Sequence, residues 1–86
     1  MNIMNKIDIE NLGCFGKARL IVEATPEARI YSVETDIKDE EPVCHAYVLL
    51  GDQVLNQDAE NLSREDILSR GVDVTKNILR TPWRKL

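Results

Sequence analysis

The sequence is short of several residue types on which common functions depend. Its 86 residues include one tryptophan, two tyrosines and one phenylalanine, which leaves little aromatic surface for stacking nucleic-acid bases. A single histidine, His45, excludes catalysis by a pair of histidines. The two cysteines, Cys14 and Cys44, have no cysteine or histidine at the spacing of metal ligands. We therefore expect no metal and no cofactor, and we expect the thiols to be reduced, with a disulfide between Cys14 and Cys44 as the alternative.

Long apolar runs are also missing. The longest, residues 46–50, is far shorter than the roughly 20 residues that cross a bilayer. Residues 1–6 lack the apolar segment of a secretory signal peptide. These absences predict a cytoplasmic protein with no membrane partner.

The residues that are present fit one small acidic domain spanning 1–86. A chain of this length buries only about 60–65% of its unfolded surface, which is too little for two cores. The net charge of −4 is unevenly distributed. Residues 1–69 hold six basic and fourteen acidic side chains, a net −8, whereas residues 70–86 hold five basic and one acidic, a net +4. The acidic excess disfavours a general role in coating polyanions.

Alternation of apolar and polar residues predicts strands along the first part of the chain. These strands cover about 5–10, 17–24, 29–37 and 43–50. A two-residue turn at Gly51-Asp52 would allow a short fifth strand at 53–56. If Ala24 pairs with Arg29 across the turn between the strands at 17–24 and 29–37, Arg19 lies opposite Glu34. If Ile37 pairs with Cys44 between the strands at 29–37 and 43–50, His45 lies beside Asp36.

After residue 62 the apolar spacing changes to every three or four residues, which predicts a helix over about 63–80 and a tail over 81–86. Ser63 with Asp66 resembles a capping box, and Pro82 ends the helix. Gly71 lies on the apolar stripe. We expect a continuous helix, and a break into two short helices at Gly71 is the alternative. The fold class is thus α+β: an antiparallel four- or five-stranded β-meander with one C-terminal amphipathic helix packed on one face.

Two surfaces are candidates for binding a partner. Residues 34–41 carry a net −4, and such an acidic rim can steer a basic partner. If one helix covers one side of the sheet, several aliphatic side chains cluster on the open side, as at a homodimer or partner interface. Trp83 either seals the end of the helix or anchors a partner. The predicted partner-binding residues are Glu34, Asp36, Asp39, Glu40 and Glu41 in the acidic rim, Ile21, Ile30, Leu49 and Val54 in the aliphatic patch, and Trp83.

These features favour a non-catalytic protein-binding module, comparable in character to inhibitors, immunity proteins, antitoxins or phage-encoded antagonists. The partner is another protein of unknown identity, and a homodimer is a further expectation. An alternative is nucleic-acid binding through the basic end formed by Lys76, Arg80, Arg84 and Lys85.

A second alternative is a small oligomeric enzyme that uses Cys14 or His45. The segment Gly13-Cys14-Phe15-Gly16-Lys17 resembles a phosphate-binding loop only in part, because it is too short and leads into a predicted strand. We interpret it as a glycine-bounded loop between strands. The sequence therefore predicts no catalytic residues.

Overall fold

The computed structural model describes residues 13–56 and 62–86, without the side chains of residues 36–38 and 42. The predicted strand at 5–10 lies outside these residues. The elements, in chain order, are α1 (Cys14–Ala24), β1 (Arg29–Lys38), β2 (Glu41–Leu50), β3 (Gln53–Val54), α2 (Arg64–Arg70), β4 (Gly71–Asp73), α3 (Thr75–Arg80) and the 3₁₀ helix η3 (Trp83–Lys85).

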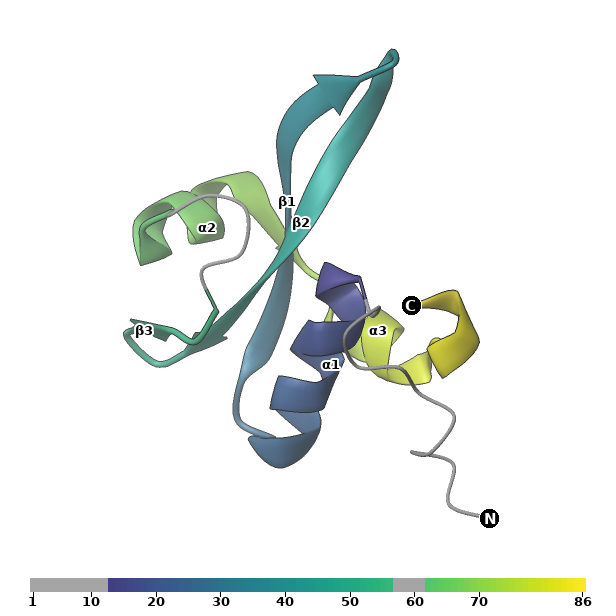
Figure 1. Cartoon of the computed structure of the whole chain (residues 1–86). Helices are drawn as coiled ribbons and strands as arrows, with labels where there is room; N and C mark the ends of the chain where they lie inside the picture. The colour runs from purple at the N-terminus through teal and green to yellow at the C-terminus, as the bar shows by residue number, and fades with distance from the viewer. Residues whose placement is uncertain (1–12, 57–61) are drawn as a thin grey trace.

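The strands form a four-stranded antiparallel sheet in the order β3-β2-β1-β4. The α+β class and a four-stranded antiparallel sheet are thus confirmed. The predicted meander is wrong, because β4 comes from the segment predicted as helix and pairs with β1 at the edge of the sheet. The helices lie on both sides of this sheet, with α2 on one side and α1 and α3 on the other (Figure 1). The sheet is therefore the middle layer of the molecule, whereas the sequence predicted a helix on one side only.

The segment predicted as a strand at 17–24 is part of helix α1, so that prediction is wrong. The apparent alternation misleads because Ala18 and Val22, which share a strand face, are also four residues apart and share a helix face. Both are buried, whereas Ala24, assigned to the same strand face, is exposed. An ion pair at helical spacing, Arg19 Nε to Glu23 Oε1 at 3.1 Å, joins the first two turns to the last.

The β1–β2 hairpin exists, but its predicted register is wrong. Glu34 lies opposite Cys44, and His45 lies opposite Val33 instead of Asp36. The register shifts between Glu34 and Asp36, which places a β-bulge at Thr35. A bulge adds one residue to one strand, so pairing worked out from strict alternation fails beyond it.

The predicted continuous helix over 63–80 is interrupted, so the alternative break at Gly71 is the correct one. The N-cap is where the sequence placed it, because Ser63 Oγ accepts a hydrogen bond from the Asp66 backbone N–H at 3.1 Å. Helix α2 ends at Arg70, and β4 then pairs with β1 before α3 begins. A Cβ atom at Gly71 would lie 2.6 Å from the Ile67 carbonyl oxygen and 3.0 Å from Val33 Cγ2. This crossing therefore requires glycine.

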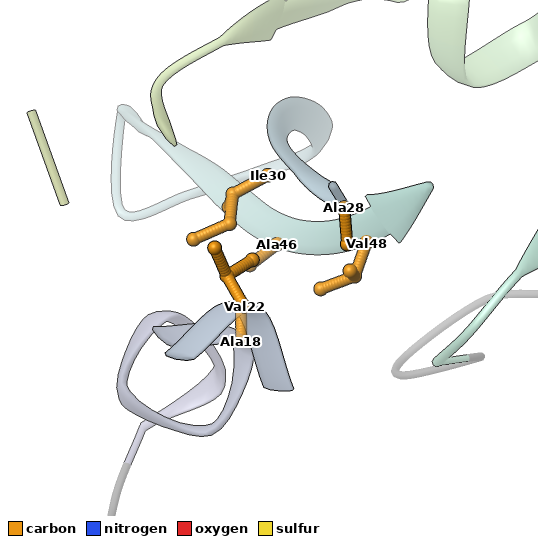
Figure 2. Packing of buried hydrophobic residues seen from close by; sticks show 6 residues of the cluster. All are labelled: Ala18, Val22, Ala28, Ile30, Ala46 and Val48. Atoms are coloured by element: carbon orange, nitrogen blue, oxygen red, sulfur yellow. The ribbon is translucent and has the colours of Figure 1, made fainter. Parts of the chain in front are cut away.

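The core consists of two apolar clusters, one on each side of the sheet. On the α1 side, Ala18 and Val22 point toward the sheet residues Ile30, Ala46 and Val48 (Figure 2). On the α2 side, the buried cluster consists of Val33, Tyr47, Leu49, Leu62 and Ile67. The apolar residues of the segment 63–80 are divided between the two clusters: Ile67 packs on the α2 side, whereas Val74 and Ile78 pack on the α1 side. A single straight helix cannot reach both sides, which is why the chain crosses the sheet edge at β4.

Side chains continue the hydrogen bonding where the edge strands are short. Beyond β3, Asn56 Oδ1 accepts from the Val48 backbone N–H at 2.6 Å, and Asn56 Nδ2 donates to the Ala46 carbonyl at 3.0 Å. Beyond β4, the buried Thr75 Oγ1 accepts from the Ile30 backbone N–H at 2.8 Å. These contacts satisfy the backbone groups that a further strand would use.

Candidate partner-binding surface

The part of the hairpin nearest its turn lies beyond the core, and we call residues 34–44 the acidic arm. Buried side chains end at Val33 on β1 and resume at Ala46 on β2. No described side chain of the arm is buried. Figure 1 shows this end of the hairpin extending past the helices into open space. The arm is therefore held by its strand pairing and not by packing against the core, and a two-stranded hairpin alone is only marginally stable in water.

The turn of the arm has a backbone conformation that one of its residues, Glu40, does not favour. Asp39 and Glu40 have φ values of 53° and 67°, both in the left-handed region. Two-residue hairpin turns of this kind prefer Asn-Gly or Asp-Gly, because glycine has no Cβ to clash. The other tight turn of the sheet, Gly51-Asp52, is of a different kind: it has glycine at its first position, where Gly51 has φ 57°, and Asp52 has no positive φ. A glutamate at position 40 thus costs stability that glycine would not.

The arm also carries unbalanced negative charge. The side chains of Glu34, Asp39, Glu40 and Glu41 are exposed. The ion pairs among the described residues are Arg19–Glu23 and Arg29–Asp73, and neither lies in the arm. The nearby Arg70 donates at 3.2 Å to the backbone carbonyl of Glu34, not to its carboxylate. Asp36 belongs to β1 in the same segment, but its side chain is outside the described part.

The basic residues lie at the other end of the molecule. Lys76, Arg80, Arg84 and Lys85 are exposed on α3 and η3, which lie away from the hairpin turn in Figure 1. None of these four forms an ion pair with a described residue. The charge asymmetry along the sequence thus becomes an asymmetry in space.

The aliphatic patch predicted on an open sheet face does not form. Ile30 is 0% exposed and Leu49 is 6% exposed, and they belong to the clusters on opposite sides of the sheet. Ile21 and Val54 are half-buried and pack against these same two clusters. The patch was predicted for a sheet with one bare face, and α1 and α2 cover both faces. The apolar basis for a homodimer interface at these residues is therefore removed.

Other apolar side chains are exposed instead. Val72 on β4 is 66% exposed, and Leu68 and Leu79 are 39% and 40% exposed. Periodicity alone assigned these residues to a buried stripe. The interruption at Gly71 changes the direction of the chain, so Val72 and Leu79 no longer continue the face that Ile67 began; Leu68 precedes the interruption and is exposed on α2 itself.

Trp83 is held within the fold by an arginine of α1. The Arg19 guanidinium carbon lies 4.3 Å from the centroid of the Trp83 ring, a cation–π geometry. The same guanidinium donates to the Thr81 carbonyl. The indole is half-buried, and its contact with Arg19 joins η3 to α1. The interpretation that Trp83 seals the end of the helical region fits this contact.

The residues of the enzyme hypothesis are not brought together as a catalytic pair. His45 lies opposite Val33 on β1, and its Nδ1 is buried without a hydrogen-bond partner among the described residues. Cys14 packs against the α1-side cluster, and Cys44 is exposed on β2; neither forms a disulfide within the described part of the chain. The Gly13–Lys17 segment, interpreted as a loop between strands, begins α1 instead. Within residues 13–56 and 62–86, no group of three or more His, Cys, Asp or Glu side chains is arranged to hold a metal.

Sequence reasoning missed a polar cluster where β4 meets α3. Asp73 accepts hydrogen bonds from Arg29 Nε at 2.9 Å, from the Thr75 N–H at 3.0 Å and from Thr75 Oγ1 at 2.7 Å. Burial acts to raise the pKa of Asp73, but the hydrogen bonds from Arg29 and Thr75 outweigh it and hold this pKa below the usual 3.8. The cluster is structural, because Thr75 in turn accepts the Ile30 N–H. An Asp-x-Thr spacing at a helix start is the local signal that could have revealed it.

Comparisons of the chain with protein-family models, with curated proteins and with solved structures find no match. In the part of the chain that the structure describes, no helix has the length and apolar character needed to cross a membrane.

Proposed function

We propose that this protein is a non-catalytic binding module that presents its acidic arm to a basic surface of another protein. The observation that carries the proposal is the exposed, unpaired charge on a hairpin that projects beyond the core. The carboxylates of Glu34, Asp39, Glu40 and Glu41 form no ion pair with the described residues. Projecting charge of one sign raises association rates with an oppositely charged partner.

The turn supplies a second line of support. Asp39 and Glu40 occupy a left-handed turn in which glycine is more stable than glutamate at the second position. Residues that break a local preference without benefit to the fold commonly serve a function elsewhere. Here Glu40, the residue that costs stability, also adds charge at the tip of the arm.

The proposal is tested with paired charge-neutralising variants in affinity capture from cells of the source organism. Glu34→Gln/Glu41→Gln removes two charges from the arm without changing the turn. The matched control, Glu27→Gln/Asp52→Asn, removes two charges from exposed residues outside the arm that form no ion pair with a described residue. Proteins retained on each are identified by mass spectrometry, and each candidate is then purified for binding kinetics.

The expected result is a protein that binds the wild type and the control and is lost or much weakened with the arm variant. Its association rate should fall several-fold at low salt and converge with that of the wild type as salt rises, because exposed charges are screened over about 8–10 Å. Retention of the same proteins by all three chains, with equal association rates, would show that the arm is not the binding surface.

Nucleic-acid binding remains the alternative, and the exposure of Lys76, Arg80, Arg84 and Lys85 on one end of the molecule favours it as the second candidate. It predicts salt-dependent binding of mixed-sequence DNA or RNA that Arg80→Glu/Arg84→Glu abolishes. Absence of binding at low salt excludes it. The contact of Arg19 with the Trp83 ring reduces the aromatic surface that bases could stack on.

A further inference from the structure

The edge of β2 that faces away from β1 is paired over only part of its length. In an antiparallel strand, the N–H and C=O groups of every second residue point to the same edge. On β2 these residues include Ala46 and Val48, because Asn56 accepts from the Val48 N–H and donates to the Ala46 carbonyl. Among the described residues, β3 pairs only with Leu49 and Leu50. The edge beyond Ala46, toward the tip of the acidic arm, therefore faces no described strand.

Three backbone groups are open on this part of the edge. Cys44 lies two residues from Ala46, so its N–H and C=O point the same way, and the N–H of Ala46 joins them. No hydrogen bond joins these three groups to a described residue. Pro42 is the next residue with this orientation, and a proline is tolerated there because its nitrogen faces away from β1. Two donors and one acceptor in a row are the groups that an added strand engages.

The side chains around this edge carry negative charge. Glu34 lies opposite Cys44, and Asp39, Glu40 and Glu41 follow toward the tip; all four carboxylates are exposed and form no ion pair with a described residue. Neighbouring strands are about 4.8 Å apart, so long side chains of a strand beside β2 would reach these carboxylates. A basic strand is therefore favoured. A second copy of this chain is disfavoured, because its own β2 edge would bring a second acidic arm.

We propose that the partner of the acidic arm contributes an extended basic segment, which adds to the sheet as a further strand beside residues 42–46 of β2. Its backbone accepts hydrogen bonds from the N–H groups of Cys44 and Ala46 and donates to the Cys44 carbonyl. Its lysine or arginine side chains lie toward Glu41 and the turn. This inference rests on the proposed function and specifies how the partner is held: charge raises the rate of encounter, and backbone pairing selects an extended segment.

The probe is a peptide of about nine residues with blocked ends that alternates lysine with threonine, a residue common in strands. One comparison peptide has the same sequence with N-methyl groups on its central residues, which keeps the charge and removes the backbone donors. The other replaces each lysine with glutamate. Two-dimensional NMR titration should show saturable binding of the lysine peptide at concentrations up to about 1 mM and none of the glutamate peptide. The N-methylated peptide should bind roughly fivefold more weakly or worse, because it cannot donate to the Cys44 carbonyl.

Hydrogen exchange separates strand addition from simple charge attraction. When the lysine peptide saturates the protein, exchange of the Cys44 and Ala46 amides should slow roughly fivefold or more, because both become hydrogen bonded. The amide of Gly51, in the turn at the other end of β2, is the internal control and should change less than about twofold.

A matched pair of variants connects the binding to this edge. Cys44→Pro removes an outward N–H without changing the charge or the pairing with β1, and Cys44→Ser keeps the N–H. The lysine peptide should bind Cys44→Pro roughly fivefold more weakly or worse, and Cys44→Ser within about twofold of the wild type. If circular dichroism shows that Cys44→Pro does not fold, the N-methylated peptide and the exchange rates of the wild type decide the question.

Equal binding of the two lysine peptides, unchanged exchange of the Cys44 and Ala46 amides, or no saturable binding of the lysine peptide would overturn strand addition. Slow exchange of the Cys44 amide without peptide, together with a dimer mass in light scattering, would also overturn it by showing that a second copy occupies the edge. These failures are distinct from failure of the proposed function. Loss of a captured protein by Glu34→Gln/Glu41→Gln, with equal binding of the two lysine peptides, would support the arm as a binding surface and refute the added strand.

Discussion

Replacing the turn of the acidic arm with Asp39→Asn/Glu40→Gly should stabilise the protein. Glu40 has φ 67°, a conformation that costs a residue with a Cβ about 1–2 kcal/mol and costs glycine very little. The greater freedom of glycine in the unfolded chain offsets about 0.4–1 kcal/mol of this gain. Asparagine at position 39 adds a few tenths, since it tolerates left-handed backbone well. The expected net gain is about 1 kcal/mol.

Thermal unfolding followed by circular dichroism measures this gain. For a chain of 86 residues, 1 kcal/mol corresponds to a rise in Tm of about 4–8 °C. Asp39→Asn/Glu40→Gln is the matched control, because it removes the same two charges without introducing glycine and should change Tm by only about 1–2 °C. If the glutamine control gains as much as the glycine variant, charge repulsion and not backbone strain is the cause.

Gly51 calibrates the backbone contribution in the same molecule. It has φ 57°, and a Cβ added there would meet no atom within 4 Å, so Gly51→Ala measures the left-handed penalty without a steric clash. It should destabilise by about 1 kcal/mol. If Gly51→Ala loses this amount but Asp39→Asn/Glu40→Gly gains nothing, the reasoning about the arm turn is refuted.

Three further predictions concern the junctions around β4. Gly71→Ala should destabilise by about 2 kcal/mol or more in urea unfolding, since its Cβ would meet the Ile67 carbonyl oxygen at 2.6 Å; a loss comparable to that of Gly51→Ala would contradict the close approach. Thr75→Val should cost about 1–3 kcal/mol by leaving the Ile30 N–H unpaired, whereas Thr75→Ser should retain most of the stability. The lowered pKa of Asp73 means that its ionised form contributes stability above pH 3.8, and this contribution is lost as pH falls through the lower folded value. Asp73→Asn should therefore destabilise at pH 7 and show a smaller loss of stability between pH 5 and pH 2, and an unchanged acid profile would argue against the cluster.

Short sequence patterns correctly predicted those elements whose structure depends mainly on residues close together in the sequence. The strand pattern found β1 and β2, Gly51-Asp52 gave the turn before β3, and Ser63 gave the start of α2. Local patterns failed where two structures share a spacing. Ala18 and Val22 fit either a strand face or a helix face, and only packing on Ile30, Ala46 and Val48 favours the helix (Figure 2).

The aliphatic patch was predicted wrongly because the number of helix layers on the sheet was predicted wrongly. A sheet with one helix leaves a bare face, and the predicted patch occupied that face. With α1 and α2 on opposite sides, Ile30 and Leu49 become core residues. A groove between α1 and α3 could not be foreseen, because two of the residues that line it, Phe15 and Ile78, are 63 positions apart in the sequence and come to the same groove only when α1 packs beside α3.

The sequence by itself determined where charge lies along the chain, because ionisable side chains are set by composition. It thereby located both the acidic segment at 34–41 and the basic residues that follow position 70. Only the tertiary structure decided that the acidic segment projects beyond the core while the neighbouring strand residues are buried on both sides. Burial depends on which elements pack together, and those contacts join residues far apart in the sequence, whose pairing no local pattern specifies.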